Sequence, residues 1–211
     1  MKRPIFLAGQ SLIEMLIVLF IIALGLFAVV SLIFSNVALQ EQDADQIVAT
    51  NLAREALEMV QNMRDTNWLL GDRPFDYGML VEGAVSAPTP VVDCTVVPAW
   101  DGGAVPAPFF DATPNDLSQA RVYKQGVEGY FTNTVTATST EYQRLLTLAP
   151  ICEDPNNSAN KAVAEGACAC PPAGFPTYTK RIGLRAKADV RWLRKNRQRN
   201  LTIYGDFYDW R

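Results

Sequence analysis

An uninterrupted apolar stretch, residues 15–34 (MLIVLFIIALGLFAVVSLIF), constrains this chain more than any other feature. A helix of about 20 apolar residues is long enough to cross the ~30 Å hydrocarbon core of a bilayer. Glu14 stands immediately before the stretch, and no other charged residue follows until Glu41. Because a lone carboxylate is costly in hydrocarbon, neither a plain membrane anchor nor a signal peptide needs it. The sequence therefore predicts a membrane-spanning helix with a functional acid at its edge.

The basic residues around this stretch predict its orientation. Lys2 and Arg3 precede it, whereas residues 35–53 contain neither Lys nor Arg. Positive charge is retained on the cytoplasmic side of a membrane helix. We therefore expect a single-pass protein of the cytoplasmic membrane with its N-terminus inside and the bulk of the chain outside.

Four cysteines follow the apolar stretch, in the part that this orientation places in an oxidising space, and we expect disulfides there. Structural zinc is the alternative, but a C-x-C sequence without C-x-x-C or histidine fits zinc spacings poorly. A bond between Cys168 and Cys170 would be strained. We therefore expect Cys94 and Cys152 to pair with these two, in either order.

The composition excludes several classes of function. The chain of 211 residues has no histidine, which removes His-based general-base and nucleophile chemistry, and we expect neither an enzyme nor a cofactor. Residues 153–160 (EDPNNSAN) offer oxygen ligands without EF-hand spacing, so no metal site is expected. A net charge of −3 argues against general nucleic-acid affinity.

One segment departs from this acidic average. Residues 180–199 hold nine Lys or Arg and one Asp, which allows DNA or another surface ligand as a partner. The alternative is a basic hairpin that packs against the acidic part of the helix or against a neighbouring subunit, and we favour this alternative.

The chain from Gln10 to about Arg64 contains no proline and predicts one long helix, about 80 Å in length at 1.5 Å per residue. Residues 10–35 are apolar on all sides, as in a membrane or a filament core. Residues 36–66 are amphipathic, with apolar residues every three or four positions: Ala44, Val48, Leu52, Ala56, Met59 and Met63.

The rest of the chain, residues 67–211, predicts a head of strands and long loops. Alternation on both sides of the polar turn RKNRQ predicts a C-terminal β-hairpin. We expect an α+β fold in which the second half of the helix packs on this antiparallel sheet. The expected elements are a loop at 71–118 with short strands around 78–82 and 91–97, strands at 129–138 and 142–150, a loop at 153–176, and hairpin strands at 184–193 and 199–210.

The N-terminal sequence resembles a known family. A basic leader, residues 1–9, ends in Gly9 and is followed by QSLIEMLIVLFIIALGL, which is similar to the type IV prepilins and the pseudopilins of type II secretion. The resemblance continues more loosely through ATNLAREALEMVQNMRDTNWL and the terminal DFYDW. It implies cleavage between Gly9 and Gln10 by a prepilin peptidase, N-methylation of Gln10, and a role for Glu14 in assembly.

The resemblance also implies a type IV pilin-like fold, other pilin subunits and a pilus assembly platform as partners, and an extracellular filament as the destination. We favour a minor pilin, because long, disulfide-stapled loops are less suited to repetitive packing. A type II secretion pseudopilin and a membrane-anchored adhesin that does not polymerise are the alternatives. Two positions depart from the family: Gln10 replaces the usual Phe, and Ser31 replaces the proline of many major pilins, which leaves Gly25 as a helix-breaking point.

Overall fold

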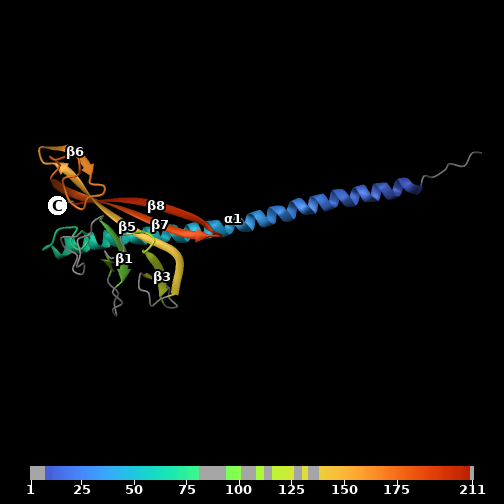
Figure 1. Ribbon diagram of the computed structural model, residues 1–211, viewed down its shortest axis with the longest axis horizontal. Coiled ribbons are helices and arrows are strands. Elements are labelled where there is room, and N and C mark those ends of the chain that lie inside the picture. Colours follow the sequence, from blue (N-terminus) through green and yellow to red (C-terminus); the bar gives the residue numbers. More distant parts are fainter. Residues whose placement is uncertain are drawn as a thin grey trace, which may run out of the picture. The chain divides into compact units, whose positions relative to one another are not determined.

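The computed structural model describes residues 8–80, 94–100, 108–111, 116–125, 130–132 and 138–209. The chain forms two compact units, Met1–Gln46 and Ile47–Arg211, and each is treated by itself. One helix, α1 (Ala8–Leu70), contributes to both units, and antiparallel strands follow it (Figure 1), which confirms the α+β class. The strands are β1 (Thr95–Trp100), β2 (Pro108–Asp111), β3 (Arg121–Gln125), β4 (Tyr130–Thr132), β5 (Thr138–Asp154), β6 (Asn157–Val163), β7 (Lys180–Arg194) and β8 (Arg197–Tyr208).

The ends and continuity of α1 follow from its sequence. The helix passes Gly25 and Ser31 without a break. It stops where Gly71 adopts a φ of 73°, a left-handed conformation that glycine accepts without steric cost. The Gly71 amide donates to the carbonyl of Asn67 at 3.2 Å, and Pro74 follows soon after. The long helix expected from Gln10 to about Arg64 is confirmed, and it continues to Leu70.

The head has its own core, built on the later turns of α1. The buried residues of these turns recur every three or four positions, as an amphipathic helix requires. Many of them are alanines, and two residues of β7 in the same core are alanines as well. Ala44, which the sequence pattern assigned to this face, is exposed, and the face begins instead at Val48. The core residues from α1 are Ala49, Leu52, Ala53, Ala56, Met59 and Val60, and those from β7 are Leu184, Ala186, Ala188, Val190 and Trp192.

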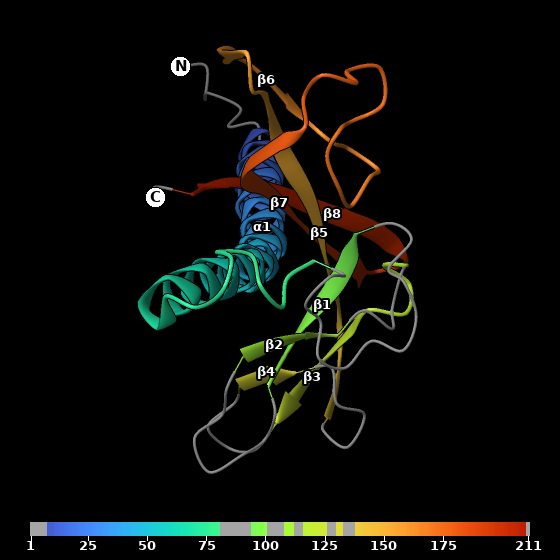
Figure 2. The ribbon, with the colours of Figure 1, turned by 90° about the vertical axis from the view of Figure 1, so that its left-hand side faces the viewer.

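The central strand of the sheet is β5. Along one edge it pairs with β7 from Tyr142↔Trp192 to Glu153↔Lys180, and β7 pairs in turn with β8 (Figure 2). The other edge of β5 pairs successively with β3, β1 and β6. The smaller partners β2 and β4 extend the sheet from β1 and β3. Segments far apart in the chain are thus brought into one continuous hydrogen-bonded surface.

The C-terminal hairpin is confirmed. Strands β7 and β8 pair from Gly183↔Tyr208 to Arg194↔Arg197, which leaves Lys195 and Asn196 as a two-residue turn. Both have positive φ, 44° and 62°, as a turn whose twist matches that of the flanking strands requires.

Three loop predictions need correction. Residues 153–176 are not one loop, because β5 extends to Asp154 and β6 pairs with it. The side chains of β6 are mostly exposed, so this strand lacks the apolar alternation that would have revealed it. The strand expected around 78–82 is a turn as far as Leu80, and Gly78 has a φ of 80°; the rest lies outside the described residues. Residues 71–118 contain β2 as well as β1, whose start lies in the expected strand at 91–97.

The expected strand at 129–138 is only partly described. Its start forms β4 and its last residue begins β5, while residues 133–137 lie outside the described part of the chain. The expected strand at 142–150 is the middle of β5, and this prediction is confirmed.

A buried ion pair joins the helix to the middle of the sheet. The Arg144 guanidinium on β5 is fully buried and lies 2.8 Å from a carboxylate oxygen of Glu55 on α1. It also donates to the carbonyl of Leu52 at 3.2 Å. Burial lowers the pKa of Arg144, and the charge and hydrogen bond of Glu55 oppose that shift. Glu55 therefore compensates a cation that the core would otherwise exclude.

We predict that Glu55→Gln lowers the free energy of unfolding of the head by about 3 kcal/mol, because it leaves the Arg144 charge buried and uncompensated. Urea unfolding of the full chain in detergent, followed by tryptophan fluorescence, measures this. Glu58→Gln, an exposed change one turn along the same helix, should cost less than about 0.5 kcal/mol. Equal effects of the two variants would contradict the role given to the pair.

Candidate functional site

The candidate functional site is the apolar segment 12–39 of α1 together with Glu14. An 18-residue window of this helix reaches a mean hydropathy of 3.2, and none of it is buried. By length and composition the helix can cross a membrane. Its large apolar side chains are about half exposed or more, including Phe27 at 75% and Phe34 at 71%. Such a continuous apolar surface is not stable in water and needs lipid or other apolar helices around it.

Glu14 lies on this segment with its side chain exposed. It is the one charged residue between Arg3 and Glu41, and it forms no ion pair with the residues that the structure describes. Gly9 and Gln10 lie in the first turns of α1, and their side chains are outside the described set. Gln10 and Glu14 are four residues apart, so the helix places both positions on one face about one turn apart.

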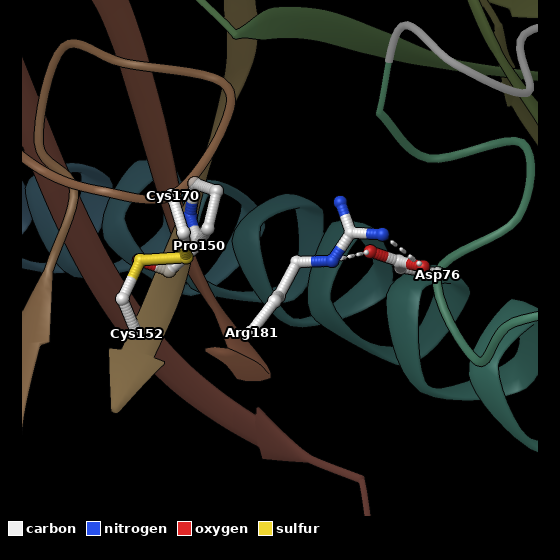
Figure 3. The surroundings of a disulfide bond; sticks show 5 residues. All are labelled: Asp76, Pro150, Cys152, Cys170 and Arg181. Carbon is white, nitrogen blue, oxygen red and sulfur yellow. Dashed lines mark hydrogen bonds and ion pairs between the residues drawn. A yellow bond between two sulfur atoms is a disulfide. The ribbon is translucent and has the colours of Figure 1, made fainter. Parts of the chain in front are cut away.

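Two disulfides staple the segment between β6 and β7 to the head. Cys94, which immediately precedes β1, pairs with Cys168. Cys152 of β5 pairs with Cys170 (Figure 3). The disulfide prediction is confirmed, and the structure selects one of the two pairings that the sequence left open. Cys152 is fully buried, so the second staple is anchored in the sheet core.

A buried ion pair lies close to the second staple. The Arg181 guanidinium on β7 points toward Asp76 (Figure 3) and lies 2.8 Å from one of its carboxylate oxygens. The Asp76 side chain is only 2% exposed. The amide of Asn67 donates to the carbonyls of Phe75 and Tyr77 at 3.0 and 2.9 Å. These contacts hold the turn that follows α1 against the sheet.

At least four of the nine cations of the basic segment 180–199 form ion pairs within the described part of the head: Lys180, Arg181, Arg185 and Lys187. Arg185 donates two hydrogen bonds to Asp206, at 2.7 and 2.8 Å, which raises the pKa of Arg185 and lowers that of Asp206. Lys187 lies 2.8 Å from Asp189, and this hydrogen bond raises the pKa of Lys187. The segment is therefore less basic as a surface than its composition indicates.

Comparison with known proteins identifies no relative of this chain. No family model, no curated protein and no solved structure matches this chain. Its class rests on its own features: a helix whose apolar segment can span a membrane and carries one acid, Glu14, and a disulfide-stapled α+β head.

Several important residues could not have been found in the sequence. Glu55 and Arg144 are 89 positions apart, and Asp76 and Arg181 are 105 apart. Each pair depends on how α1 and its following turn lie on the sheet. The only sequence signal was the presence of charged residues inside otherwise apolar patterns.

We predict that the two disulfides contribute unequally to stability. The Cys94–Cys168 bond spans 74 residues and the Cys152–Cys170 bond spans 18. A disulfide that closes a longer loop restricts the unfolded chain more. Replacing both Cys94 and Cys168 by Ser should therefore lower the free energy of unfolding by about 4 kcal/mol, and replacing both Cys152 and Cys170 by about 3 kcal/mol. Urea unfolding of both double variants measures the difference.

Peptide mapping of the non-reduced protein is the control on pairing. It should yield one cluster in which the peptide that contains both Cys168 and Cys170 is linked to a peptide with Cys94 and to another with Cys152. Fragmentation of this cluster between Cys168 and Cys170 should assign Cys94 to Cys168 and Cys152 to Cys170. A link between Cys94 and Cys152 would contradict the connectivity on which the stability prediction rests.

Proposed function

We propose that this chain is a subunit of a type IV pilus or a related filament, most similar to a minor pilin. The observation that carries the proposal is the exposed apolar segment of α1, which carries Glu14 and follows Gly9 and Gln10 in prepilin spacing. Before assembly the bilayer covers this segment. In the filament the corresponding helices of other subunits cover it.

Processing creates the partner that Glu14 needs. A prepilin peptidase cuts the bond between Gly9 and Gln10, which removes the basic leader and leaves an α-ammonium group on Gln10. That amine keeps its positive charge at neutral pH, since its ordinary pKa is about 7.7–8.0, and N-methylation does not remove the charge.

Glu14 then acts in docking. When apolar helices bundle and exclude water, an uncompensated carboxylate costs several kcal/mol, whereas a paired one does not. The ammonium group of Gln10, in the same subunit or in a neighbour, is the nearest cation that residues 10–40 offer. The pairing thereby selects one axial position of a subunit relative to the next.

The head supports a specialised position in the filament. Its segment between β6 and β7 is held by both disulfides, so it can project from the sheet without losing its conformation. A pseudopilin of type II secretion would use the same helix and the same processing. A membrane-anchored adhesin would use the helix without polymerising, and the experiment below separates it from a filament subunit.

We predict that Glu14→Ala abolishes incorporation into filaments and leaves membrane insertion intact. The variant removes the carboxylate that pairs with the new N-terminus but makes the helix more apolar. The measurement compares the amount of the chain in sheared filaments and in the membrane fraction of cells that produce the filament.

Glu58→Ala is the matched control, because it removes an exposed glutamate from the head part of the same helix. It should assemble as the wild type does. Filaments that contain Glu14→Ala at the wild-type level would overturn the docking role. Absence of the wild-type chain from every filament preparation would favour the anchored adhesin.

A further inference from the structure

A polar hollow of about 460 Å³ lies on the head, where strands β3, β5, β7 and β8 come together. This volume is within the range of small-ligand pockets, roughly 300–1,000 Å³. Its lining combines two arginines, Arg121 and Arg191, with hydroxyl and amide side chains and one carboxylate, Glu141. It lies wholly in the Ile47–Arg211 unit.

Strand register builds the floor of this hollow. Arg121 of β3 is opposite Gln143 of β5, and Gln143 is opposite Arg191 of β7. Directly opposed residues point to the same face of a sheet. Buried Arg144 and Val190, the neighbours of Gln143 and Arg191, face the core, so this row lies on the face turned away from α1.

The two arginines differ from the other cations of this surface. Arg185 and Lys187, six and four residues before Arg191 on β7, are neutralised by Asp206 and Asp189. Among the described residues, neither Arg121 nor Arg191 has a carboxylate within ion-pair distance. Arg121 donates to the hydroxyl of Ser139 at 3.3 Å, and the buried Nε of Arg191 has no hydrogen-bond partner. The hollow therefore holds guanidinium donors in need of an acceptor.

We propose that this hollow binds an acidic sugar, with the carboxylate of a uronic acid between Arg121 and Arg191. A guanidinium group matches a carboxylate with two parallel hydrogen bonds. The amide of Gln143 and the hydroxyl of Ser139 lie in the same lining and suit the ring hydroxyls.

The remaining lining residues favour a sugar over nucleic acid. Glu141 can accept hydrogen bonds from the hydroxyl groups of a sugar ring. It repels any anion, but a phosphate chain brings several negative charges into the hollow and a uronic acid brings only one. Single-stranded nucleic acid binds chiefly by stacking its bases on exposed aromatic rings. Trp192, the aromatic residue of the lining, is only 7% exposed and offers no such platform. Leu193, by contrast, is 51% exposed and can cover the C–H face of a sugar ring.

This inference goes beyond filament assembly. The hollow is built from strands of the head alone, so it gives the chain a ligand whether or not it polymerises. The class of ligand is an acidic saccharide, such as a uronic acid unit of a surface polysaccharide.

The test is a ligand-observed NMR titration of the full chain in detergent micelles with sodium glucuronate. Glucuronate should bind the wild type, and glucose, which lacks the carboxylate, should bind at least about tenfold more weakly. Arg121→Gln and Arg191→Gln should each raise the dissociation constant for glucuronate about tenfold, because each removes a charge-assisted pair of hydrogen bonds.

Arg54→Gln is the matched control. Arg54 is an exposed arginine on α1, and its replacement removes the same charge without altering the hollow, so it should leave the dissociation constant unchanged. Arg121 is also exposed, so its variant keeps the test informative should Arg191→Gln disturb the fold.

Three results would overturn the proposal. One is the absence of glucuronate binding to the wild type, and another is equal binding of glucose. The third is displacement of glucuronate by a deoxythymidine oligomer whose own binding depends on the same two arginines, which would make the hollow a nucleic-acid site.

Discussion

The apolar surface of residues 12–39 is the constraint on which the rest of this structure depends. A helix whose large side chains are exposed over this whole length cannot persist in water, so lipid or other helices must surround it. The head therefore cannot use this segment for its own stability. It uses the later turns of the same helix, where alanines and Leu52 pack on β7. One helix thus serves two environments, and the composition of its residues changes between them.

Within the head, charged groups add specificity to an apolar core. A buried ion pair such as Arg144 with Glu55 is weak evidence of stability, because desolvation offsets much of the attraction. We infer that its main effect is to set the position of α1 along β5, since any slip would leave the guanidinium uncompensated. The ion pair between Arg181 and Asp76 sets the position of the turn after the helix in the same way. The two disulfides then fix the segment between β6 and β7, which has little core of its own.

The sequence predicted the features that depend on local patterns. The apolar run, the absence of proline from Gln10 to Arg64 and the alternation around RKNRQ gave the helix and the hairpin, and the spacing of Gly9 and Glu14 gave the candidate site. It did not predict β6, because an exposed edge strand has no buried face to produce alternation. Nor could it predict the row of Arg121, Gln143 and Arg191, which exists only once the register of three strands is known. Local spacing was enough to predict a processing and assembly motif, whereas a ligand site made of several strands requires the fold.

The central claim is that processing after Gly9 supplies a cation for Glu14. The most direct test is the intact mass and N-terminal sequence of the chain isolated from the membranes of its own cells. The account predicts a protein that has lost residues 1–9 and begins at Gln10, carrying one extra methyl group when that amine is methylated. A mature chain that begins at Met1, or one cut at the far side of the apolar stretch, would contradict it.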